Sequence, residues 1–243
     1  MARDTGHATP LQTALEQLRP HTHLCSIYET PEEHFAVAVP FIKIGLDRGE
    51  KCIYIVDDGT EAAIREALSA GNIDVGMAIA NGRLMLETKE TVYLKNGSFD
   101  PEWMFTFWMD AAGQATKEGF SALRATGETE WFLRSGTGLD RWLEYESRLT
   151  HMLSHQKCVL LCQYNRLHFS PELLLDIIRT HPTIIYRGVV SRNMYYVPAD
   201  EYLSPGHAER ELERLLTNMR EREEIEYQLR QQHNELRESE KRW

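Results

Sequence analysis

The strongest constraint on the fold is a regular alternation along the chain between short apolar segments and longer amphipathic ones. Cys52–Val56 and Cys158–Tyr164 are dominated by apolar residues over the length of a buried strand, and amphipathic stretches of helix length separate such segments. Three of the expected helices start with a capping residue followed by proline, at Thr30-Pro31, Asp100-Pro101 and Ser170-Pro171. Strands that alternate with helices predict an α/β fold, with a mostly parallel central sheet and helices on both faces.

The predicted sheet domain extends over residues 21–203. Its expected strands are His23–Tyr28, Cys52–Val56, Arg83–Glu87, Ser121–Ala125, Cys158–Tyr164, Thr183–Tyr186 and Met194–Val197, with an antiparallel edge at the end of the series. Its expected helices are 31–49, Ala62–Ala70, Pro101–Lys117, Leu139–His155 and Pro171–Arg179. Before this domain, residues 1–20 are expected to hold one short amphipathic helix built on Leu11, Ala14, Leu15 and Leu18.

Residues 204–243 differ in character from the rest of the chain. From residue 207 onward there is no Gly or Pro, and ten acidic and eight basic residues nearly balance. Apolar residues recur there in a weak heptad pattern, at Leu212, Leu215, Met219, Leu229, Leu236 and Trp243. The pattern predicts a coiled-coil helix that pairs with a second copy of the chain, and hence a homodimer. Because the sequence stops on Trp243 without a C-cap, we expect a signalling helix that continues in a longer protein, with an input module upstream.

Composition restricts the partners and the compartment. The formal net charge is −10, which argues against a nucleic acid or an anionic membrane surface as partner. No apolar stretch approaches the roughly 20 residues of a membrane span, and the N-terminus lacks the pattern of a signal peptide. The four cysteines are expected to be buried thiols in a reducing compartment, so a cytoplasmic location is predicted.

The loop after the first expected strand lacks the features of a phosphate-binding loop. Such a loop needs glycines, whose backbone N–H groups approach the phosphate, and a lysine that neutralises it. Residues 25–34 contain neither, and Glu29, Glu32 and Glu33 crowd the start of the helix and would repel phosphate. ATP is therefore not expected as a cofactor of this domain.

A ligand pocket is nevertheless expected at the carboxyl ends of the parallel strands, where α/β sheets form their crevices. The candidate ligand-binding residues are Tyr28, Glu29, Asp57, Asp58, Arg124, Thr126, Gly127, Glu128, Trp131, Tyr164, Asn165 and His181. Glu128 is the candidate acid, base or amine-binding group among them, with a capping or surface carboxylate as the alternative. No motif identifies a catalytic residue.

The spacing of the cysteines and histidines does not predict a metal site. Cys158 and Cys162 lie on the same face of one strand, about 13 Å apart, so they cannot chelate one ion together. His151 and His155 have the i, i+4 spacing of ligands on a helix but lack a partner carboxylate or an HExxH pattern. Buried thiols and surface histidines are the favoured interpretation.

Several short motifs, in order along the chain, resemble the MEDS family, the methanogen/methylotroph DcmR sensory domain. The motifs include Tyr28-Glu29-Thr30-Pro31-Glu32-Glu33, Gly49-Glu50-Lys51-Cys52, Thr126-Gly127-Glu128, Cys162-Gln163-Tyr164 and His181-Pro182, and the resemblance covers about residues 20–203. It implies a RecA/KaiC-like sensory domain that has lost the phosphate loop. It also implies an input module of a histidine kinase or transcription regulator that senses small hydrocarbon-derived molecules.

The segment 235–243 in turn resembles the helix that leads into a PAS domain, which points to a sensor histidine kinase as the parent protein. No phosphoacceptor motif or ATP lid lies in the chain, so this part is not expected to be an enzyme itself. The expected partners are a small-molecule ligand, a second copy of the chain and, through the parent kinase, a response regulator. Two alternatives remain: a residual nucleotide-binding RecA-like enzyme domain, with phosphate contacts from Arg124 or Arg166, and a dimerisation scaffold without a ligand.

Overall fold

The computed structural model describes residues 9–136, 138–205 and 207–240. Its strands are β1 (Thr22–Tyr28), β2 (Lys51–Val56), β3 (Leu84–Thr88), β4 (Leu123–Glu128), β5 (Cys158–Asn165), β6 (Thr183–Tyr186) and β7 (Val189–Arg192). Its helices are α1 (Pro10–Gln17), α2 (Pro31–Asp47), α3 (Glu61–Ala70), α4 (Val75–Ala80), α5 (Pro101–Lys117), α6 (Leu139–Leu153), α7 (Pro171–Thr180), α8 (Ala199–Tyr202) and α9 (His207–Glu240), with a 3-10 helix η1 (Glu130–Arg134).

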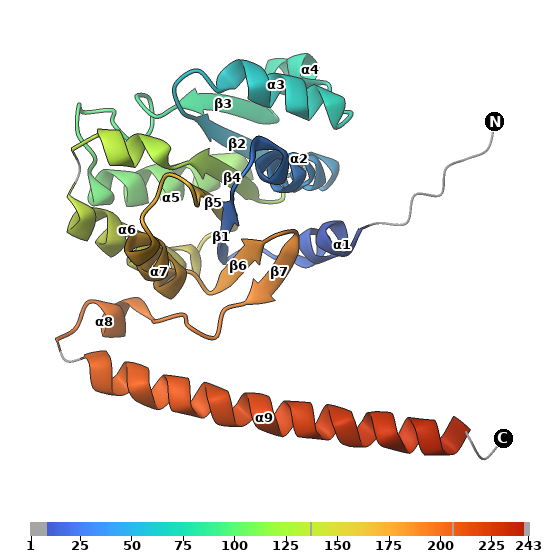
Figure 1. The fold of residues 1–243 in the computed structure, drawn as a ribbon. Coiled ribbons are helices and arrows are strands. Elements are labelled where there is room, and N and C mark those ends of the chain that lie inside the picture. The colour runs from blue at the N-terminus through green and yellow to red at the C-terminus, as the bar shows by residue number, and fades with distance from the viewer. Residues whose placement is uncertain (1–8, 137, 206, 241–243) are drawn as a thin grey trace, which may run out of the picture. The chain divides into compact units, whose positions relative to one another are not determined.

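The strands form one seven-stranded sheet in the order β3-β2-β4-β5-β1-β6-β7 (Figure 1). All neighbouring pairs are parallel except β6 and β7, which are antiparallel. The parallel strands therefore end at the same edge of the sheet. This confirms the predicted α/β class with a mostly parallel sheet and an antiparallel strand at its edge.

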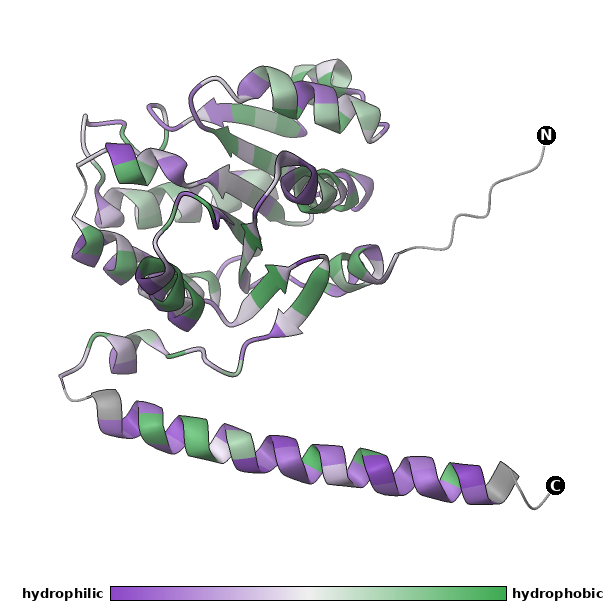
Figure 2. Ribbon diagram, in the orientation of Figure 1, coloured by the Kyte–Doolittle hydropathy of each residue, from purple (hydrophilic) through white to green (hydrophobic). Residues whose placement is uncertain are grey.

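Helices cover both faces of the sheet, and the strands in its centre are buried on both sides. Helices α1 to α4 pack on one face, where Phe41 and Ile42 of α2 meet Leu161 of β5 in one buried cluster. Helices α5, α6 and α7 pack on the other face, where Trp108 donates its indole N–H to the Tyr145 hydroxyl across 2.8 Å. Figure 2 shows apolar residues concentrated along the strands. The core thus has two halves, one on each side of the sheet.

Helix α2 begins at the predicted Pro31 and ends at Asp47, two residues before the expected end at residue 49. The Thr30 hydroxyl accepts the Glu33 N–H across 3.3 Å, Pro31 occupies the first turn, and the Glu33 carboxylate accepts the Glu29 N–H across 2.8 Å. These contacts satisfy N–H groups that would otherwise lack a partner at the start of a helix.

The end of the sheet differs from the prediction. Residues Met194–Val197 are not a strand, and the last strand is β7, which pairs with β6 in a hairpin. Arg187 and Gly188 between them both have positive φ, 48° and 73°, which is the geometry of a two-residue hairpin turn with the twist of the sheet. An arginine at the first of these positions gives no turn signal in the sequence, so the hairpin was missed.

The chain divides into two compact units, one up to Ala199 and one from Asp200 onward. The second unit consists of α9 and the short segment before it. Within the described residues of α9, Leu212, Met219, Leu229 and Leu236 are exposed, and the helix is otherwise mostly hydrophilic (Figure 2). Trp243 of the predicted heptad pattern lies outside the described residues. None of the helices in the described parts of the chain has the length and apolar character that a membrane span requires.

Candidate functional site

The predicted pocket residues do not form a single group, because the pleat of the strands sends them to opposite faces of the sheet. Neighbouring residues of a strand point to opposite faces, so Tyr28, Thr126 and Glu128 lie on the α2 face. Tyr164 points to the other face, towards α6. The carboxyl edge of the sheet thus borders two separate polar sites.

Glu128 is the centre of the polar site on the α2 face. Its side chain is buried, accepts the Asp57 N–H across 3.2 Å and lies 3.4 Å from the Tyr54 hydroxyl. Burial raises the pKa of Glu128 to about 7, against the hydrogen bonds from Thr60 and the Asp57 N–H, which lower it. A carboxyl group with this pKa exchanges its proton near neutral pH.

Aromatic and imidazole rings surround this carboxyl group. The Tyr54 hydroxyl lies 2.9 Å from Nε2 of His34, and the His34 ring stacks on Tyr28 with ring centroids 4.6 Å apart. Burial lowers the pKa of His34 to about 4, so this imidazole is neutral at physiological pH. His34 and Tyr54 were absent from the predicted set because buried polar residues inside a helix and a strand resemble core residues in a sequence.

Asp57 and Asp58 are neutralised by cations that the sequence analysis did not identify. Lys89 lies 3.1 Å from Asp57 and also pairs with Asp58, and Arg134 lies 2.6 Å from Asp57. Burial opposes the ionisation of Asp57, but the Asp58 N–H, Arg134 and Lys89 outweigh it and lower the pKa. These ion pairs join the loop after β2 to the loop after β3 and to η1, so both aspartates hold loops together.

A cavity of about 370 Å³ opens beside Tyr28, between β1, β6 and α2. Its lining residues are Ser26, Ile27, Tyr28, Glu33, Ala36, Val37, Ile185, Arg187 and Gly188. At its rim, the Glu29 carboxylate pairs with Arg166 across 2.7 Å and accepts the Tyr186 hydroxyl across 3.3 Å. The volume is in the range of small-molecule pockets.

Three other predicted residues make structural contacts and do not line this cavity. Thr126 donates its hydroxyl to the Leu161 carbonyl across 2.9 Å, and Trp131 is buried and stacks on Tyr93 with centroids 4.7 Å apart. A Cβ at Gly127 would lie 2.9 Å from the Tyr93 hydroxyl, so this glycine leaves room for the tyrosine.

Asn165 and Arg124 also lie outside the cavity. The Oδ1 atom of the Asn165 side chain accepts the Leu167 N–H across 3.0 Å and fixes the loop after β5. Arg124 lies near the amino end of β4, at the opposite end of the strand from the crevice, where it is fully buried and paired with Glu50. The prediction placed Arg124 with the crevice because the expected strand ended at Ala125, whereas β4 continues to Glu128.

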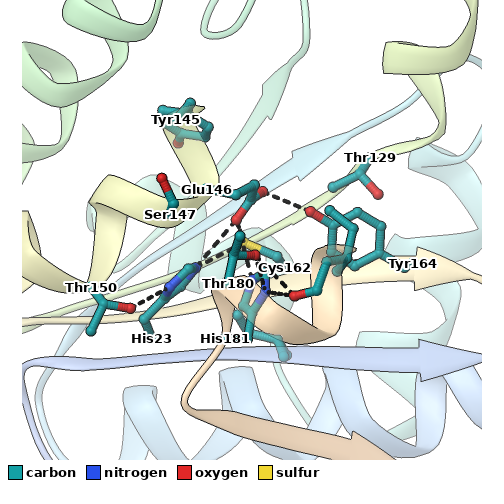
Figure 3. Close-up of polar contacts among 12 residues, drawn as sticks. His23, Thr129, Tyr145, Glu146, Ser147, Thr150, Cys162, Tyr164, Thr180 and His181 are labelled. Carbon is teal, nitrogen blue, oxygen red and sulfur yellow. Dashed lines mark hydrogen bonds and ion pairs between the residues drawn. The ribbon is translucent and has the colours of Figure 1, made fainter. Parts of the chain in front are cut away.

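The second polar site lies on the opposite face and is buried. Figure 3 shows its residues and their polar contacts. Glu146 of α6 lies between two histidines, with its Oε2 atom 3.4 Å from Nε2 of His23 and 3.2 Å from Nε2 of His181. The Cys162 sulfur lies 3.7 Å from the same oxygen, and the Tyr164 hydroxyl donates to Oε1 across 2.7 Å. The four groups come from β1, α6, β5 and the turn after α7.

Burial and mutual charge set the ionisation within this cluster. Burial opposes the ionisation of Glu146, but His181 and His23 outweigh it and hold its pKa well below the usual range. Burial and the neighbouring His181 lower the pKa of His23 to about 4, against the effect of Glu146. Burial, reinforced by Glu146, raises the pKa of the Cys162 thiol.

Of these four residues, the predicted pocket contained only His181. The cluster was missed because its members lie far apart in the sequence and come together through the order of the strands. His23, Glu146, Cys162 and His181 offer donor atoms within 4.8 Å of one another, which makes the cluster a candidate metal-binding group. All four cysteines are free and buried, as the sequence predicts.

A second cavity, of about 490 Å³, lies between α5 and the strands β2 and β3. Trp103 and Phe107 of α5 line it together with Ile53 and Met85, and charged residues stand around them. It is open to solvent along the helix.

Comparison with known proteins agrees with this architecture. Residues 22–182, about two thirds of the chain, match the family model described as the MEthanogen/methylotroph, DcmR Sensory domain. The chain is 28% identical over 187 residues to the transcriptional repressor DcmR of Methylorubrum extorquens, a match that covers 72% of this chain and 63% of the repressor. The chain thus spans less than two thirds of the length of this curated relative.

The flagellar accessory protein FlaH of Methanocaldococcus jannaschii has a similar fold. The TM-score is 0.52 at 10% identity, over 82% of this chain and 91% of that protein. This likeness concerns the fold alone and confirms the expected RecA-like α/β architecture. The family match covers most of the sheet domain, and the chain therefore belongs to the MEDS family of sensory domains.

Proposed function

We propose that the sheet domain is the ligand-sensing input of a two-component sensor histidine kinase. In this proposal a small organic molecule binds in the cavity between β1, β6 and α2. Helix α9 then transmits the change as a coiled coil to downstream PAS and kinase domains, and the kinase acts on a response regulator. The observation that carries the proposal is membership of a family of sensory domains, combined with a cavity of ligand size at the carboxyl edge of the sheet.

The chemistry of the cavity supports a small, largely uncharged ligand. Val37 and Ile185 supply an apolar wall, and Ser26 and Tyr28 supply hydroxyl groups that can orient a polar substituent. Glu33 and Arg187 lie on the same lining, but Glu33 is occupied as the cap of α2. The lining suits a hydrocarbon derivative with one or two polar atoms.

The start of α2 argues against the nucleotide-binding alternative. A RecA-like phosphate site would use free N–H groups at the start of this helix. The Thr30 hydroxyl and the Glu33 carboxylate already accept N–H groups there, and Glu29, Glu32 and Glu33 add negative charge. Arg166, one of the two arginines considered for phosphate, is paired with Glu29, and Arg124 is buried with Glu50.

The kinase output rests on the resemblance of residues 235–243 to the helix that precedes a PAS domain. The relative DcmR is a transcriptional repressor, so one type of input domain would serve different outputs in different proteins. The exposed apolar residues of α9, among them Met219 and Leu229, support a helix that pairs with another copy.

Ligand binding can be tested by thermal unfolding of the full chain. We expect one or more members of a panel of small alcohols, ketones and haloalkanes to raise the midpoint of unfolding, and Mg·ATP to leave it unchanged, because binding to the folded state stabilises it. Ala36→Trp fills the cavity and should abolish the shift, whereas Ala63→Trp on the exposed side of α3 should preserve it. Micromolar binding of Mg·ATP in isothermal titration would instead favour the nucleotide-binding alternative.

A further inference from the structure

The buried cluster around Glu146 has the geometry of a metal site. Four donor atoms converge there: Nε2 of His23, Oε2 of Glu146, Sγ of Cys162 and Nε2 of His181. Each comes from a different element, and all four side chains are fully or almost fully buried. The close-up shows the donor atoms turned towards a common centre (Figure 3).

Four of the six separations between donor atoms match those of a tetrahedron around zinc, and the other two are at most 4.8 Å. Zinc bonds of about 2.0–2.3 Å place neighbouring donors of a tetrahedral site about 3.3–3.8 Å apart. The Glu146 oxygen lies 3.4 Å from His23, 3.2 Å from His181 and 3.7 Å from Cys162. The fourth of these edges, from Cys162 to His23, is 3.6 Å. These edges lie within about 0.1 Å of the range for zinc.

The hydrogen bonds of His181 direct its Nε2 atom towards the Glu146 carboxylate. Its Nδ1 lies 2.8 Å from the Ile177 carbonyl, which can only accept, so Nδ1 carries the proton. In the neutral ring Nε2 then has a lone pair. Among the described residues this buried atom makes no hydrogen bond, although a carboxylate oxygen lies 3.2 Å away. Two acceptors at this distance repel each other, so either a proton on Nε2 or a metal ion lies between them.

The second histidine and the carboxylate are also held in position. Nδ1 of His23 contacts the Thr150 hydroxyl across 3.0 Å, and the Tyr164 hydroxyl fixes the Glu146 oxygen that faces away from the centre. Metal-binding histidines commonly have such a partner on the second nitrogen, which sets the tautomer and the orientation of the ring. Both imidazoles thus present Nε2 to the same point.

Charge balance favours a divalent ion. A dication together with one carboxylate, one thiolate and two neutral imidazoles sums to zero, which is the least costly arrangement in a site without solvent. Coordination releases the thiol proton of Cys162 to solvent, as for other thiolate ligands. The mixture of nitrogen, sulfur and oxygen donors in tetrahedral positions suits zinc better than the hard ions magnesium and calcium.

We propose that His23, Glu146, Cys162 and His181 bind one zinc ion. Four protein ligands close the coordination sphere, so the ion has a structural role. It would tie β1 and β5 to α6 and to the turn between α7 and β6. This site lies on the opposite face of the sheet from the ligand cavity and does not depend on the proposed function.

The metal content of the full chain tests the proposal. The chain is purified in metal-free buffers from cells grown without added zinc, and its metals are measured by inductively coupled plasma mass spectrometry. We expect about one zinc ion per chain, held through dialysis against a chelator because the site has no contact with solvent. A wild-type chain with less than about a tenth of an ion, which also binds no cobalt on refolding, would overturn the proposal.

Cobalt substitution identifies the ligands. Refolding with Co²⁺ should give the visible bands of tetrahedral cobalt and a thiolate-to-cobalt absorption in the near ultraviolet. Cys162→Ser should lose the thiolate absorption, whereas Cys158→Ser, a buried cysteine on the same face of the same strand, should keep it. A thiolate absorption that survives in Cys162→Ser would overturn the assignment.

The exposed pair His151 and His155 is the rival site for adventitious metal. His155→Ala should leave the bound metal unchanged, and Glu146→Gln should reduce it at least tenfold. The opposite result would overturn the proposal. Because the metal content of the wild-type chain is measured first, failure of a buried variant to fold does not leave the question open.

Discussion

Glu128 is a buried carboxyl group whose ionisation is opposed by its surroundings. Its pKa is raised to about 7 by burial, while the same group in an unfolded chain ionises near its ordinary value of about 4.3. At pH values below both pKa values, Glu128 is protonated in the folded and in the unfolded state, so it does not change the free energy of unfolding. As the pH rises, the unfolded state loses its proton first, so folding becomes less favourable until the pH exceeds the folded pKa.

The first prediction concerns Glu128→Gln. The amide is uncharged at every pH, so the variant should gain up to about 3 kcal/mol of stability relative to wild type between pH 5 and pH 8. Urea unfolding at both pH values measures this difference. Glu172→Gln, an exposed carboxylate in the first turn of α7, is the control and should change little with pH. Equal pH dependence of wild type and Glu128→Gln would refute the raised pKa.

Arg124 illustrates how a residue that is hydrophilic in the sequence can belong to the core. It pairs with Glu50 and lies over the Phe41 ring, with the guanidinium carbon 4.6 Å from the ring centroid. The second prediction is that Glu50→Ala lowers the free energy of unfolding by about 3–5 kcal/mol, because it leaves a buried guanidinium without its partner. The double variant Glu50→Met/Arg124→Met should recover much of this loss.

The matched control is the ion pair between Glu118 and Lys51, the residue that follows Glu50 in the chain. Glu118 lies at the surface, and Glu118→Ala should change the free energy of unfolding little, since solvent screens exposed ion pairs. Chemical denaturation of the variants provides the comparison. Similar losses for Glu50→Ala and Glu118→Ala would contradict the buried role of Glu50.

At the scale of elements, the close contact of α2 with the sheet depends on Gly45. A Cβ at this position would lie 2.6 Å from Cδ of Arg124 and 2.7 Å from the Cys52 sulfur. Gly113 of α5 is also inside a helix, but a Cβ there would meet no atom within 4 Å among the described residues. The same substitution therefore has opposite consequences in the two helices.

The third prediction follows from this contrast. Gly45→Ala should destabilise the chain by about 1–3 kcal/mol, because the clash with two core side chains exceeds the gain in helix propensity. Gly113→Ala should stabilise it by about 0.5–1 kcal/mol, since only the propensity changes. The midpoints of thermal unfolding measure both effects, and a stabilising Gly45→Ala would show that α2 lies further from the sheet.

Most elements of the sheet domain were predictable from the sequence, because apolar strands and Pro-started helices have strong local signals. Helices α2 and α5 begin at the predicted Pro31 and Pro101. The missed elements have weak local signals: α4 has six residues, and the β6–β7 turn carries an arginine at a positive φ. Their conformations depend on packing and strand pairing that a local pattern does not encode.

The two polar sites were less predictable than the fold. Topology correctly placed the end of β4 and the loop after β2 at one edge of the sheet, where Glu128 and Asp57 meet. The cluster around Glu146 could not be predicted from local patterns, because its members contact one another through the pairing of β1 with β5 and the packing of α6. No spacing rule along one element could have found it.

At the scale of the whole molecule, the fourth prediction concerns association through α9. Met219 and Leu229 are exposed along the helix, so we expect a dimer in which they are buried between two copies. Met219→Lys/Leu229→Lys should give a monomer in light scattering coupled to size exclusion, whereas Gln228→Lys/Gln231→Lys should remain a dimer. A monomeric wild-type chain, or a lysine variant at the heptad positions that stays dimeric, would refute the pairing.

In the proposed function, the sheet domain binds a small molecule and the chain signals as a dimer. Native mass spectrometry of the full chain, as purified and after incubation with the panel of hydrocarbon derivatives, tests both parts together. We expect a dimer that carries additional small-molecule mass, distinguishable from zinc by its size, and loss of that mass in Ala36→Trp. A monomer whose mass stays that of the polypeptide, with or without metal, under all of these conditions would contradict the proposed function.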